Sequence, residues 1–225
     1  MKNIRNLIWA MLAISASAHS LEFFPNRGQL SVPVKSIKEI QFGDVLRQQY
    51  DFSCGSAALA SLLTYHYEQP STEQTIFQIM FDNGNKELIE EQGFSMLDMK
   101  NYLGSIGLRA DGFSMELSTI RKIGVPGITL VNFDGYMHFV VIKGINSDSV
   151  IIGDPSRGTI TMSHEEFNHY YQNVVLLVKN RANIGRAHFI TNDDFAIYND
   201  SPLEAGVRRE SLGLFSTSLP EAGEY

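Results

Sequence analysis

The sequence predicts an α+β fold in which N-terminal helices pack on an antiparallel β-sheet. Two observations in the 225 residues lead to this prediction. Between residues 54 and 123 the apolar residues recur at helical spacing, whereas residues 125–178 contain short β-rich runs separated by turns. Helices followed by a series of neighbouring strands are typical of an α+β domain.

The first 20 residues, MKNIRNLIWAMLAISASAHS, have the pattern of a secretory signal peptide. Lys2 and Arg5 form a basic start, residues 7–16 are apolar but too few to span a bilayer, and Ala16-Ser17-Ala18 supplies a cleavage pattern. We therefore expect export to the periplasm, or secretion, and no membrane span after signal cleavage. The alternative is an uncleaved N-terminal anchor.

Residues 21–42 are expected to form short strands and turns, with a turn at Gly43-Asp44. Residues 54–67 are expected to form a helix that is capped by Asp51 or Ser53. Its predicted core stripe consists of Ala57, Ala58, Leu62 and Tyr65.

Three further helices are expected in this half of the chain, over residues 71–84, 95–106 and 115–124. Ser71 or Thr72 caps the first of them, and Glu73 in its first turn suits the helix dipole. The apolar set of the helix over residues 95–106 is Leu97, Met99, Tyr102, Leu103 and Ile106.

The second half of the chain is expected to form a meander of strands. The β-rich runs are residues 125–133, 136–145, 149–155, 158–162 and 173–178, with a short helix over residues 163–171 before the last one. Residues 179–225 are punctuated by Asn, Asp, Gly, Pro and Ser, so we expect an extension that docks one or two short apolar segments and frays at its end.

Charge and motifs narrow the classes of partner. The formal charge is −7, and removal of residues 1–20 takes away two basic residues and no acidic ones, which makes it −9. An acidic chain without a Lys/Arg cluster in its sequence argues against nucleic acids and anionic membrane surfaces as partners. One cysteine and scattered histidines give no zinc pattern, and no phosphate-binding glycine loop is present, so we expect no cofactor.

Cys54 is the only cysteine in the chain. A lone cysteine in an oxidising compartment forms an intermolecular bridge, reacts as a free thiol, or packs as an inert apolar side chain. Cys54 lies at the expected first turn of a helix and is followed by small residues at 55–58. A helix N-terminus favours the thiolate, and small residues let a substrate approach closely, so this position favours a nucleophile.

A nucleophilic thiol needs a histidine base, and His138 at the start of a β-rich run is the best candidate. His66 lies late in the Cys54 helix, and the remaining candidates, His164, His169 and His188, lie on a polar helix or in the extension. Asp154 ends the next strand, and adjacent antiparallel strands place the start of one beside the end of the other. We therefore expect Asp154 to face His138, although an Asp before Pro155 is also common in turns.

An oxyanion donor is the remaining requirement of such a site. Gln48 and Gln49 both lie on the turn that enters the Cys54 helix, and either side-chain amide could point toward the same space as the Cys54 N–H. Local physics does not separate the two glutamines, and either can be a solvated loop residue.

The residues around the cysteine carry a specific resemblance. Gln48, Asp51, Cys54-Gly55, Ala57 and Leu59-Ala60 resemble the signature of the C39 family of bacteriocin-processing cysteine peptidases. The family usually has Asp or Glu immediately before the cysteine, where this chain has Ser53. The resemblance continues through the later helix and through the strands that contain His138 and Asp154, and it covers residues 43–178.

The resemblance implies a papain-like α+β fold and a role for each residue. Cys54 matches the nucleophile, His138 the base, Asp154 the orienting acid and Gln48 the oxyanion donor, which decides against Gln49. The implied organisation is a signal peptide over residues 1–20, a strand-and-turn segment over 21–42, a C39-like peptidase domain over 43–178 and a partly ordered extension over 179–225.

The implied function is that of an exported cysteine endopeptidase. The best-known members of the family are domains of ABC exporters that cut peptide leaders after a double glycine. This chain is more similar to free-standing exported members, some of which accompany the secretion of bacterial functional amyloid. The expected partner is a peptide or protein substrate, such as an amyloid component or a secreted protein with a leader.

Two alternative functions use the same residues or the same surface. One is a Cys-His-Asp amidase or acyltransferase, which would act on cell-wall peptides or transfer an acyl group to an amine. The other is a module that binds and chaperones a secreted client without cutting it. Spacing in the sequence does not distinguish these alternatives from an endopeptidase.

Overall fold

The computed structural model describes residues 36–50, 52–191 and 195 of the chain. The expected signal peptide, most of the segment 21–42 and residue Asp51 lie outside this part. The helices of the described part are α2 (Ile37–Phe42), α3 (Cys54–His66), α4 (Glu73–Asn83), α5 (Lys86–Gln92), α6 (Met96–Ser105), α7 (Leu117–Ile123), α8 (His164–Tyr170) and α9 (Ala182–Ala187).

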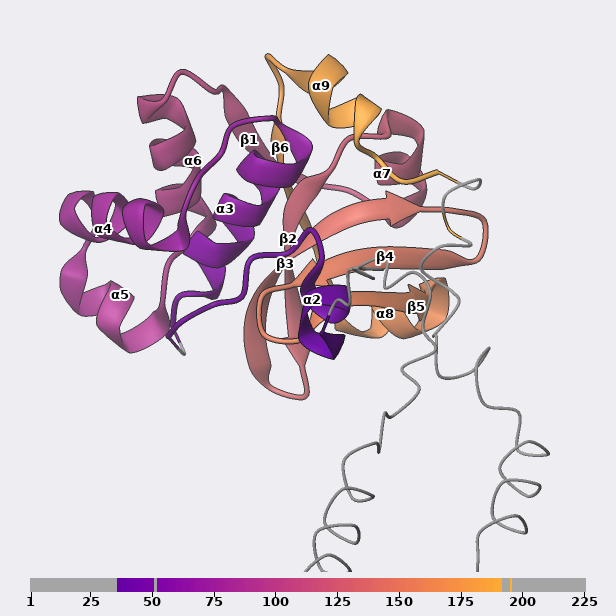
Figure 1. Cartoon of the computed structure of the whole chain (residues 1–225), viewed down its shortest axis with the longest axis horizontal. Helices are drawn as coiled ribbons and strands as arrows, with labels where there is room; N and C mark the ends of the chain where they lie inside the picture. The colour runs from indigo at the N-terminus through magenta and orange to yellow at the C-terminus, as the bar shows by residue number, and fades with distance from the viewer. Residues whose placement is uncertain (1–35, 51, 192–194, 196–225) are drawn as a thin grey trace, which may run out of the picture. The chain divides into compact units, whose positions relative to one another are not determined.

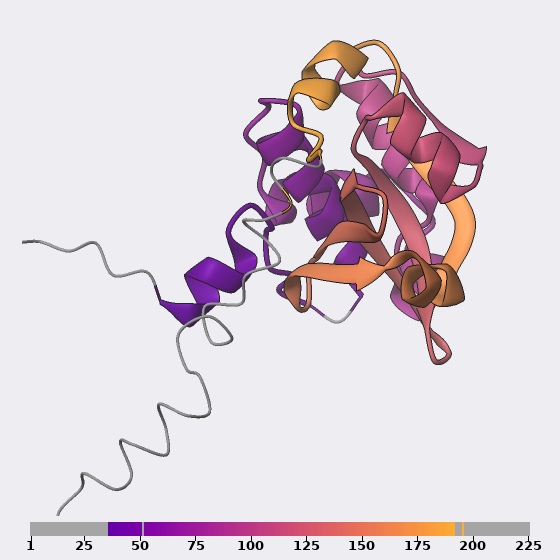
Figure 2. The ribbon, with the colours of Figure 1, turned by 90° about the vertical axis from the view of Figure 1, so that its right-hand side faces the viewer.

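One antiparallel sheet forms the centre of this unit. Its strands are β1 (Ala110–Ser114), β2 (Gly127–Phe133), β3 (Tyr136–Ile145), β4 (Ser149–Asp154), β5 (Gly158–Ser163) and β6 (Tyr171–Val178). They lie in the order β1-β6-β2-β3-β4-β5, so β2 to β5 form the expected meander and β6 pairs with the other side of β2. The turn between β2 and β3 projects from the rest of the sheet in both views of the ribbon (Figures 1 and 2).

The sheet is covered on both faces, because alternate side chains of its strands enter two separate cores. Phe139 and Val141 of β3 join a core with α3, α4, α5 and α6, which lie on one side in Figure 1. Val140 and Ile142 join a second core with α7 and α8. Burial on both faces explains why β3 reads as an unbroken apolar run in the sequence.

Helix α3 is the central helix of the first core. The helix buries more of its surface than the predicted apolar stripe, since residues 55–63 are all buried. Tyr65, a residue of the predicted stripe, is half-buried. Ser53 is the N-cap, but its side chain makes no capping hydrogen bond, so of the two predicted caps Ser53 is wrong, while Asp51 lies outside the described residues. A helix buried on all sides needs small residues, which is the structural reason for the Gly-Ser-Ala-Ala sequence after Cys54.

Three other sequence predictions require correction. Ile37–Phe42 is helical, not extended, because Ser36 and Glu39 form a capping box. Helix α5 was not predicted at all, and Asn85 caps it. Leu97, expected in the core of α6, is 62% exposed.

The segment that follows β6 packs against the sheet unit through short elements, as expected for part of the extension. Phe189 and Ile190 are buried, and Ile190 forms a parallel bridge with Gly144 of β3. The predicted fraying of the C-terminus lies outside the described residues. Within the described residues, no helix has the length and apolar character that crossing a membrane requires.

Candidate active site

Cys54 is the first residue of α3, and its thiol is free and partly exposed. The first N–H groups of a helix lack intrahelical partners and point toward this position, which favours a negative charge there. Close packing explains why the next residue, Gly55, is a glycine, because a Cβ at this position would lie 3.2 Å from Cβ of Phe94. Close packing on one side therefore holds Cys54 at the surface of the first core.

His138 and Asp154 lie together at one end of the sheet, as the strand order predicts. Nε2 of His138 is 2.8 Å from Oδ1 of Asp154, and the two side chains are 1% and 0% exposed. Antiparallel pairing of β3 with β4 brings the beginning of one strand beside the end of the other. The proximity of these two residues, inferred from strand order, is confirmed.

The turn after β4 surrounds Asp154 with hydrogen-bond donors. The backbone N–H of Ser156 donates to Oδ1 at 2.8 Å, its hydroxyl donates at 2.6 Å, and Nε of Arg157 donates to Oδ2 at 2.8 Å. The Arg157 guanidinium also lies over the Phe133 ring, 4.2 Å from its centroid. Asp154 is therefore both a turn residue and the partner of His138, and the two readings of the sequence hold together.

These contacts set the charges of the pair in opposite directions. Burial alone would lower the pKa of His138, but hydrogen bonds and charges from Asp154 and Cys54 outweigh it and raise the pKa to about 9. Burial alone would raise the pKa of Asp154, but hydrogen bonds from His138, Ser156 and Arg157 hold it well below its usual range. An imidazolium beside a carboxylate is the favoured state at neutral pH.

Cys54 is close enough to the His138 ring to contribute to its raised pKa. Since Nε2 is bound to Asp154, the nitrogen that remains for the thiol is Nδ1, which is buried and has no hydrogen-bond partner among the described residues. The structure therefore brings Cys54, His138 and Asp154 together in that order.

Gln48 lies at the edge of the same site. Its backbone N–H donates to the Pro155 carbonyl oxygen at 2.9 Å, which ties it to the turn after Asp154. Its side-chain Nε2 donates to the Tyr50 carbonyl oxygen at 3.2 Å, and the same oxygen accepts the Ser53 N–H at 3.2 Å. The Gln48 amide and the N–H of Ser53, the residue before Cys54, thus share one acceptor. Gln49 is exposed and has no side-chain contact of this kind among the described residues.

Glu73 is a residue of the site region that sequence reasoning did not connect with Cys54. Its carboxylate is buried beneath the turn and accepts the Gln49 N–H and the Ser53 hydroxyl. Twenty residues separate Glu73 from Ser53, and no local motif links them. Only the packing of α4 against α3 brings them together.

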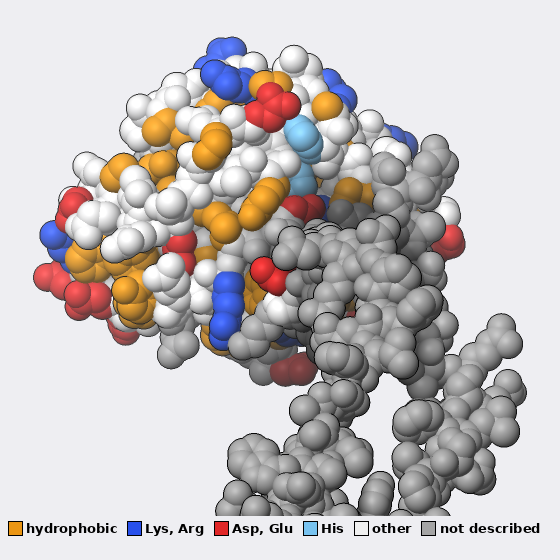
Figure 3. Space-filling view, viewed as in Figure 1, with side chains coloured by type: hydrophobic (Ala, Val, Ile, Leu, Met, Phe, Trp, Pro, Cys, Tyr) orange, Lys and Arg blue, Asp and Glu red, His pale blue; other side chains and the backbone are white. Residues whose placement is uncertain are grey.

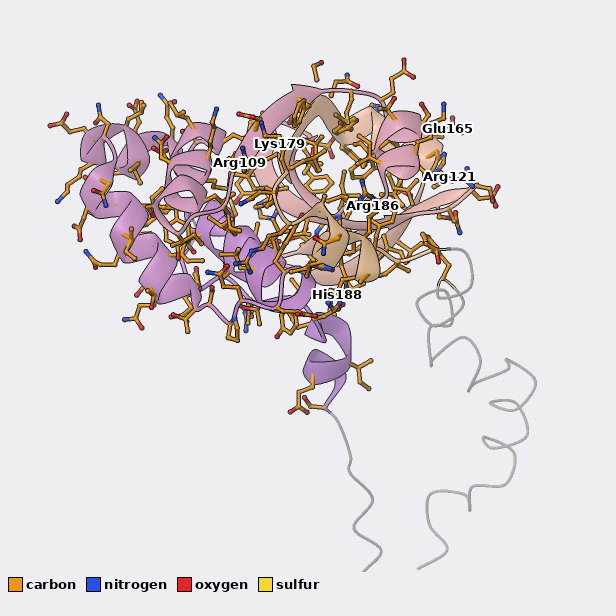
Figure 4. All side chains as sticks on the ribbon, turned by 90° about the horizontal axis from the view of Figure 1, so that it is seen from above. Arg109, Arg121, Glu165, Lys179, Arg186 and His188 are labelled. Carbon is orange, nitrogen blue, oxygen red and sulfur yellow. The ribbon has the colours of Figure 1, made fainter. Side chains whose placement is uncertain are left out.

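The other histidines lie elsewhere. His66 is buried, its Nδ1 is 3.3 Å from the His188 carbonyl oxygen, and burial lowers its pKa to about 4. His188 pairs with Glu68 and lies at the end of α9 (Figure 4). His164 and His169 belong to α8. Among the described residues, no three His, Cys, Asp or Glu side chains are grouped as metal ligands.

An apolar groove of about 780 Å³ opens beside Cys54. Helix α5, the start of α6 and the β2–β3 hairpin form its walls, and exposed apolar side chains gather over α4 and α5 in Figure 3. The apolar side chains of the groove include Phe52, Leu88, Leu97, Leu130, Tyr136 and Met137. Leu88, Leu97, Tyr136 and Met137 are 46–62% exposed, so the groove presents apolar surface to solvent. Such a surface is typical of a site that binds an apolar peptide segment.

The family model of the peptidase C39 family matches residues 44–183. The probable functional amyloid protease FapD of Pseudomonas aeruginosa is 37% identical over 180 residues, which cover 78% of this chain and 80% of that protein. The protein of the same name from Pseudomonas fluorescens is 39% identical over 171 residues, covering 76% and 73% of the two chains.

Solved structures agree with the fold expected from the resemblance. A double glycine motif protease from an AMS/PCAT transporter, solved in complex with a leader peptide, aligns with a TM-score of 0.50 at 30% identity and covers 60% of this chain and 89% of that one. The peptidase domain of Streptococcus ComA, a bi-functional ABC transporter, aligns with a TM-score of 0.52 at 22% identity, covering 60% and 96%. The papain-like α+β fold is confirmed.

Proposed function

The chain belongs to the peptidase C39 family of cysteine peptidases, and we propose that it is an exported endopeptidase whose nucleophile is Cys54. The observation that carries the proposal is the order Cys54–His138–Asp154 at the edge of an apolar groove. A nucleophile, a base that reaches it and a group that orients the base are the parts that covalent catalysis of acyl transfer requires.

Catalysis begins from an ion pair of thiolate and imidazolium. Nδ1 of His138 already holds the proton that the Cys54 thiol has given up, and Asp154 accepts Nε2–H and so fixes the ring orientation. Sγ of Cys54 then bonds to the carbonyl carbon of the substrate, and the carbonyl oxygen becomes an oxyanion. His138 donates its proton to the leaving amine as the C–N bond breaks, which leaves a thioester. Water, deprotonated by His138, attacks the thioester carbonyl carbon; the C–S bond breaks, the acid product leaves, and the Cys54 thiolate remains beside the His138 imidazolium.

The oxyanion requires donors near Sγ. The backbone N–H of Cys54 is one, because it lies in the first turn of α3, and the side-chain amide of Gln48 is the other. Gln48 reaches this role by turning its Nε2 from the Tyr50 carbonyl oxygen toward the substrate. Each donor of this kind is worth about 3 kcal/mol of transition-state stabilisation.

The substrate is a secreted or periplasmic client protein that presents an apolar segment to the groove. The complex of a related protease with a leader peptide and the amyloid-protease name of the Pseudomonas relatives both support a client of this class. Residues 1–20 supply the export signal, which makes the periplasm the compartment of the reaction. The client is then a component of an amyloid secretion system or a protein with a cleavable leader.

The test compares the wild-type protein with the variants Cys54→Ala and His138→Gln. Each is incubated with the products of neighbouring genes, and cleavage sites are mapped by mass spectrometry. We expect cleavage by the wild type and at least a 10³-fold loss in both variants, since nucleophile and base act as a unit. His169→Gln, an exposed histidine of α8, serves as the matched control and retains activity. Cleavage that persists in Cys54→Ala would contradict the mechanism.

A further inference from the structure

The side chain of Glu73 is only 5% exposed, although it begins helix α4 at the surface of the fold. A carboxylate is costly to bury unless hydrogen bonds compensate for lost water. Glu87 and Glu165 also lie in the first turns of their helices, α5 and α8, yet both are exposed. A favourable interaction with the helix dipole therefore does not explain why Glu73 is buried.

The contacts of Glu73 explain its burial. Both carboxylate oxygens lie 3.1 Å from the backbone N of Gln49, and Oε1 accepts the hydroxyl proton of Ser53. The Ser53 oxygen accepts the Tyr50 N–H at 3.2 Å. The carboxylate thus clamps both ends of the turn between Gln49 and Ser53.

This turn connects the two proposed oxyanion donors. Gln49 follows Gln48, and Ser53 precedes Cys54, so the clamp holds the residues directly adjacent to both donors. The Tyr50 carbonyl oxygen inside the turn accepts the Gln48 side-chain amide at 3.2 Å and the Ser53 N–H at 3.2 Å. A change in the shape of the turn therefore changes the distance between the Gln48 amide and the Cys54 N–H.

We infer that Glu73 is a positioning residue for the oxyanion site: its buried carboxylate fixes the Gln49–Ser53 turn and thereby the separation of the Gln48 and Cys54 donors. The inference rests on the proposed peptidase function. Glu73 touches neither the thiol nor the imidazole through any hydrogen bond of the described residues, so it acts through the turn and not on the substrate.

The first test compares the kinetics of Glu73→Gln with those of the wild type on the mapped cleavage site. The amide keeps the size of the side chain, but it places N–H groups where the carboxylate accepts hydrogen bonds, so the turn loosens. We expect kcat to fall about tenfold or more and KM to stay within about twofold, because a small displacement of donors acts on the transition state. Glu165→Gln removes a first-turn acid from α8, away from the groove, and should change neither value (Figure 4).

The second test separates oxyanion positioning from thiol reactivity. A peptide aldehyde with the sequence of the cleavage site bonds to Sγ and places a hemithioacetal oxygen in the oxyanion site. Iodoacetamide also alkylates Sγ, but it releases iodide and forms no such oxygen. In Glu73→Gln we expect the aldehyde dissociation constant to rise about tenfold and the alkylation rate constant across pH 5–9 to stay within about twofold.

Two results would overturn the inference. One is an unchanged kcat and an unchanged aldehyde affinity in a folded Glu73→Gln protein. The other is an equal loss of aldehyde affinity and of alkylation rate together with a lowered melting temperature, which indicates a purely structural role. If Glu73→Gln does not fold, Ser53→Ala removes one arm of the clamp, and the same readouts apply to it. Failure of the proposed function is distinct, because the wild type itself would then show no cleavage that depends on Cys54.

Discussion

At the scale of single residues, the charge on His138 controls the proposed chemistry. Its pKa of about 9 results from Asp154 and Cys54, which together outweigh the opposing effect of burial. Asp154 stays ionised because Ser156 and Arg157 also donate to it. The turn that follows β4 is therefore a functional element, since it keeps the carboxylate charged and pointed at the ring.

The first prediction at this scale concerns pH. Acylation needs the imidazolium to protonate the leaving amine, so kcat/KM should fall as pH rises through about 9. Asp154→Asn removes the charge that raises this pKa, so the alkaline limb should move to lower pH by about 1 unit or more. The kcat of this variant should fall by about 100-fold or more. The pH profiles of peptide cleavage by both proteins measure this.

Asp148→Asn is the matched control, because Asp148 is an exposed aspartate in the turn before β4. It should keep the wild-type profile. An unchanged alkaline limb in Asp154→Asn would contradict the assignment of that limb to the His138–Asp154 pair.

At the scale of elements, the β4–β5 turn depends on a glycine. Gly158 has a φ of 88°, and a Cβ at this position would lie 2.9 Å from the carbonyl carbon of Gln41 in helix α2. The Gln41 side chain also donates to the Arg157 carbonyl oxygen at 2.7 Å. Helix α2 is thus fastened to the turn that holds Asp154, which is a reason for the chain to form a helix there.

The prediction at this scale is that Gly158→Ala destabilises the fold and lowers activity together. Gly107→Ala is the matched control, because Gly107 has a similar φ of 80° but open space around the added Cβ. We expect about 1 kcal/mol of destabilisation for Gly107→Ala from backbone strain alone, and about 2–4 kcal/mol for Gly158→Ala from strain and contact. Urea unfolding measures both, and equal values would contradict the role of the α2 contact.

At the scale of the whole molecule, two of the buried polar features of the described residues lie in the sheet and involve ionisable groups. One is the His138–Asp154 pair, and the other is Lys143 near the end of β3, which is fully buried and binds Asp44 and Thr159. Burial lowers the pKa of Lys143. The Lys143–Asp44 pair connects the sheet to the segment that leads into α3, whereas the His138–Asp154 pair joins two strands of the sheet.

The prediction at this scale concerns stability against pH. The folded pKa of His138 is above its ordinary value of 6.5, so its contribution to stability is complete below pH 6.5 and is lost as pH rises through about 9. The contribution of Asp154 is present above pH 3.8 and is lost only as pH falls through its lower folded pKa. The melting temperature should therefore fall between pH 6.5 and 9.5, and less so in His138→Gln. Parallel curves for the two proteins would contradict this.

The tertiary structure also gathers charges that are scattered in the sequence. Arg109, Arg121, Lys179 and Arg186 come from different segments and lie on one face of the described unit (Figure 4). The sequence contains no Lys/Arg cluster, and no linear pattern reveals this arrangement. The acidic balance of the chain therefore does not reveal how charge is distributed on its surface.

The sequence by itself determined the fold class, the order of most elements and the neighbourhood of His138 and Asp154, because apolar periodicity and antiparallel pairing are local rules. It left out α5 and misjudged residues 37–42, where caps such as Asn85 and Ser36 override weak apolar patterns. Only the tertiary structure decided which ring nitrogen of His138 remains for Cys54, how Gln48 is held and why Glu73 is buried. Those features depend on contacts between segments distant in the chain, and side-chain hydrogen bonds of that kind have no period in the sequence.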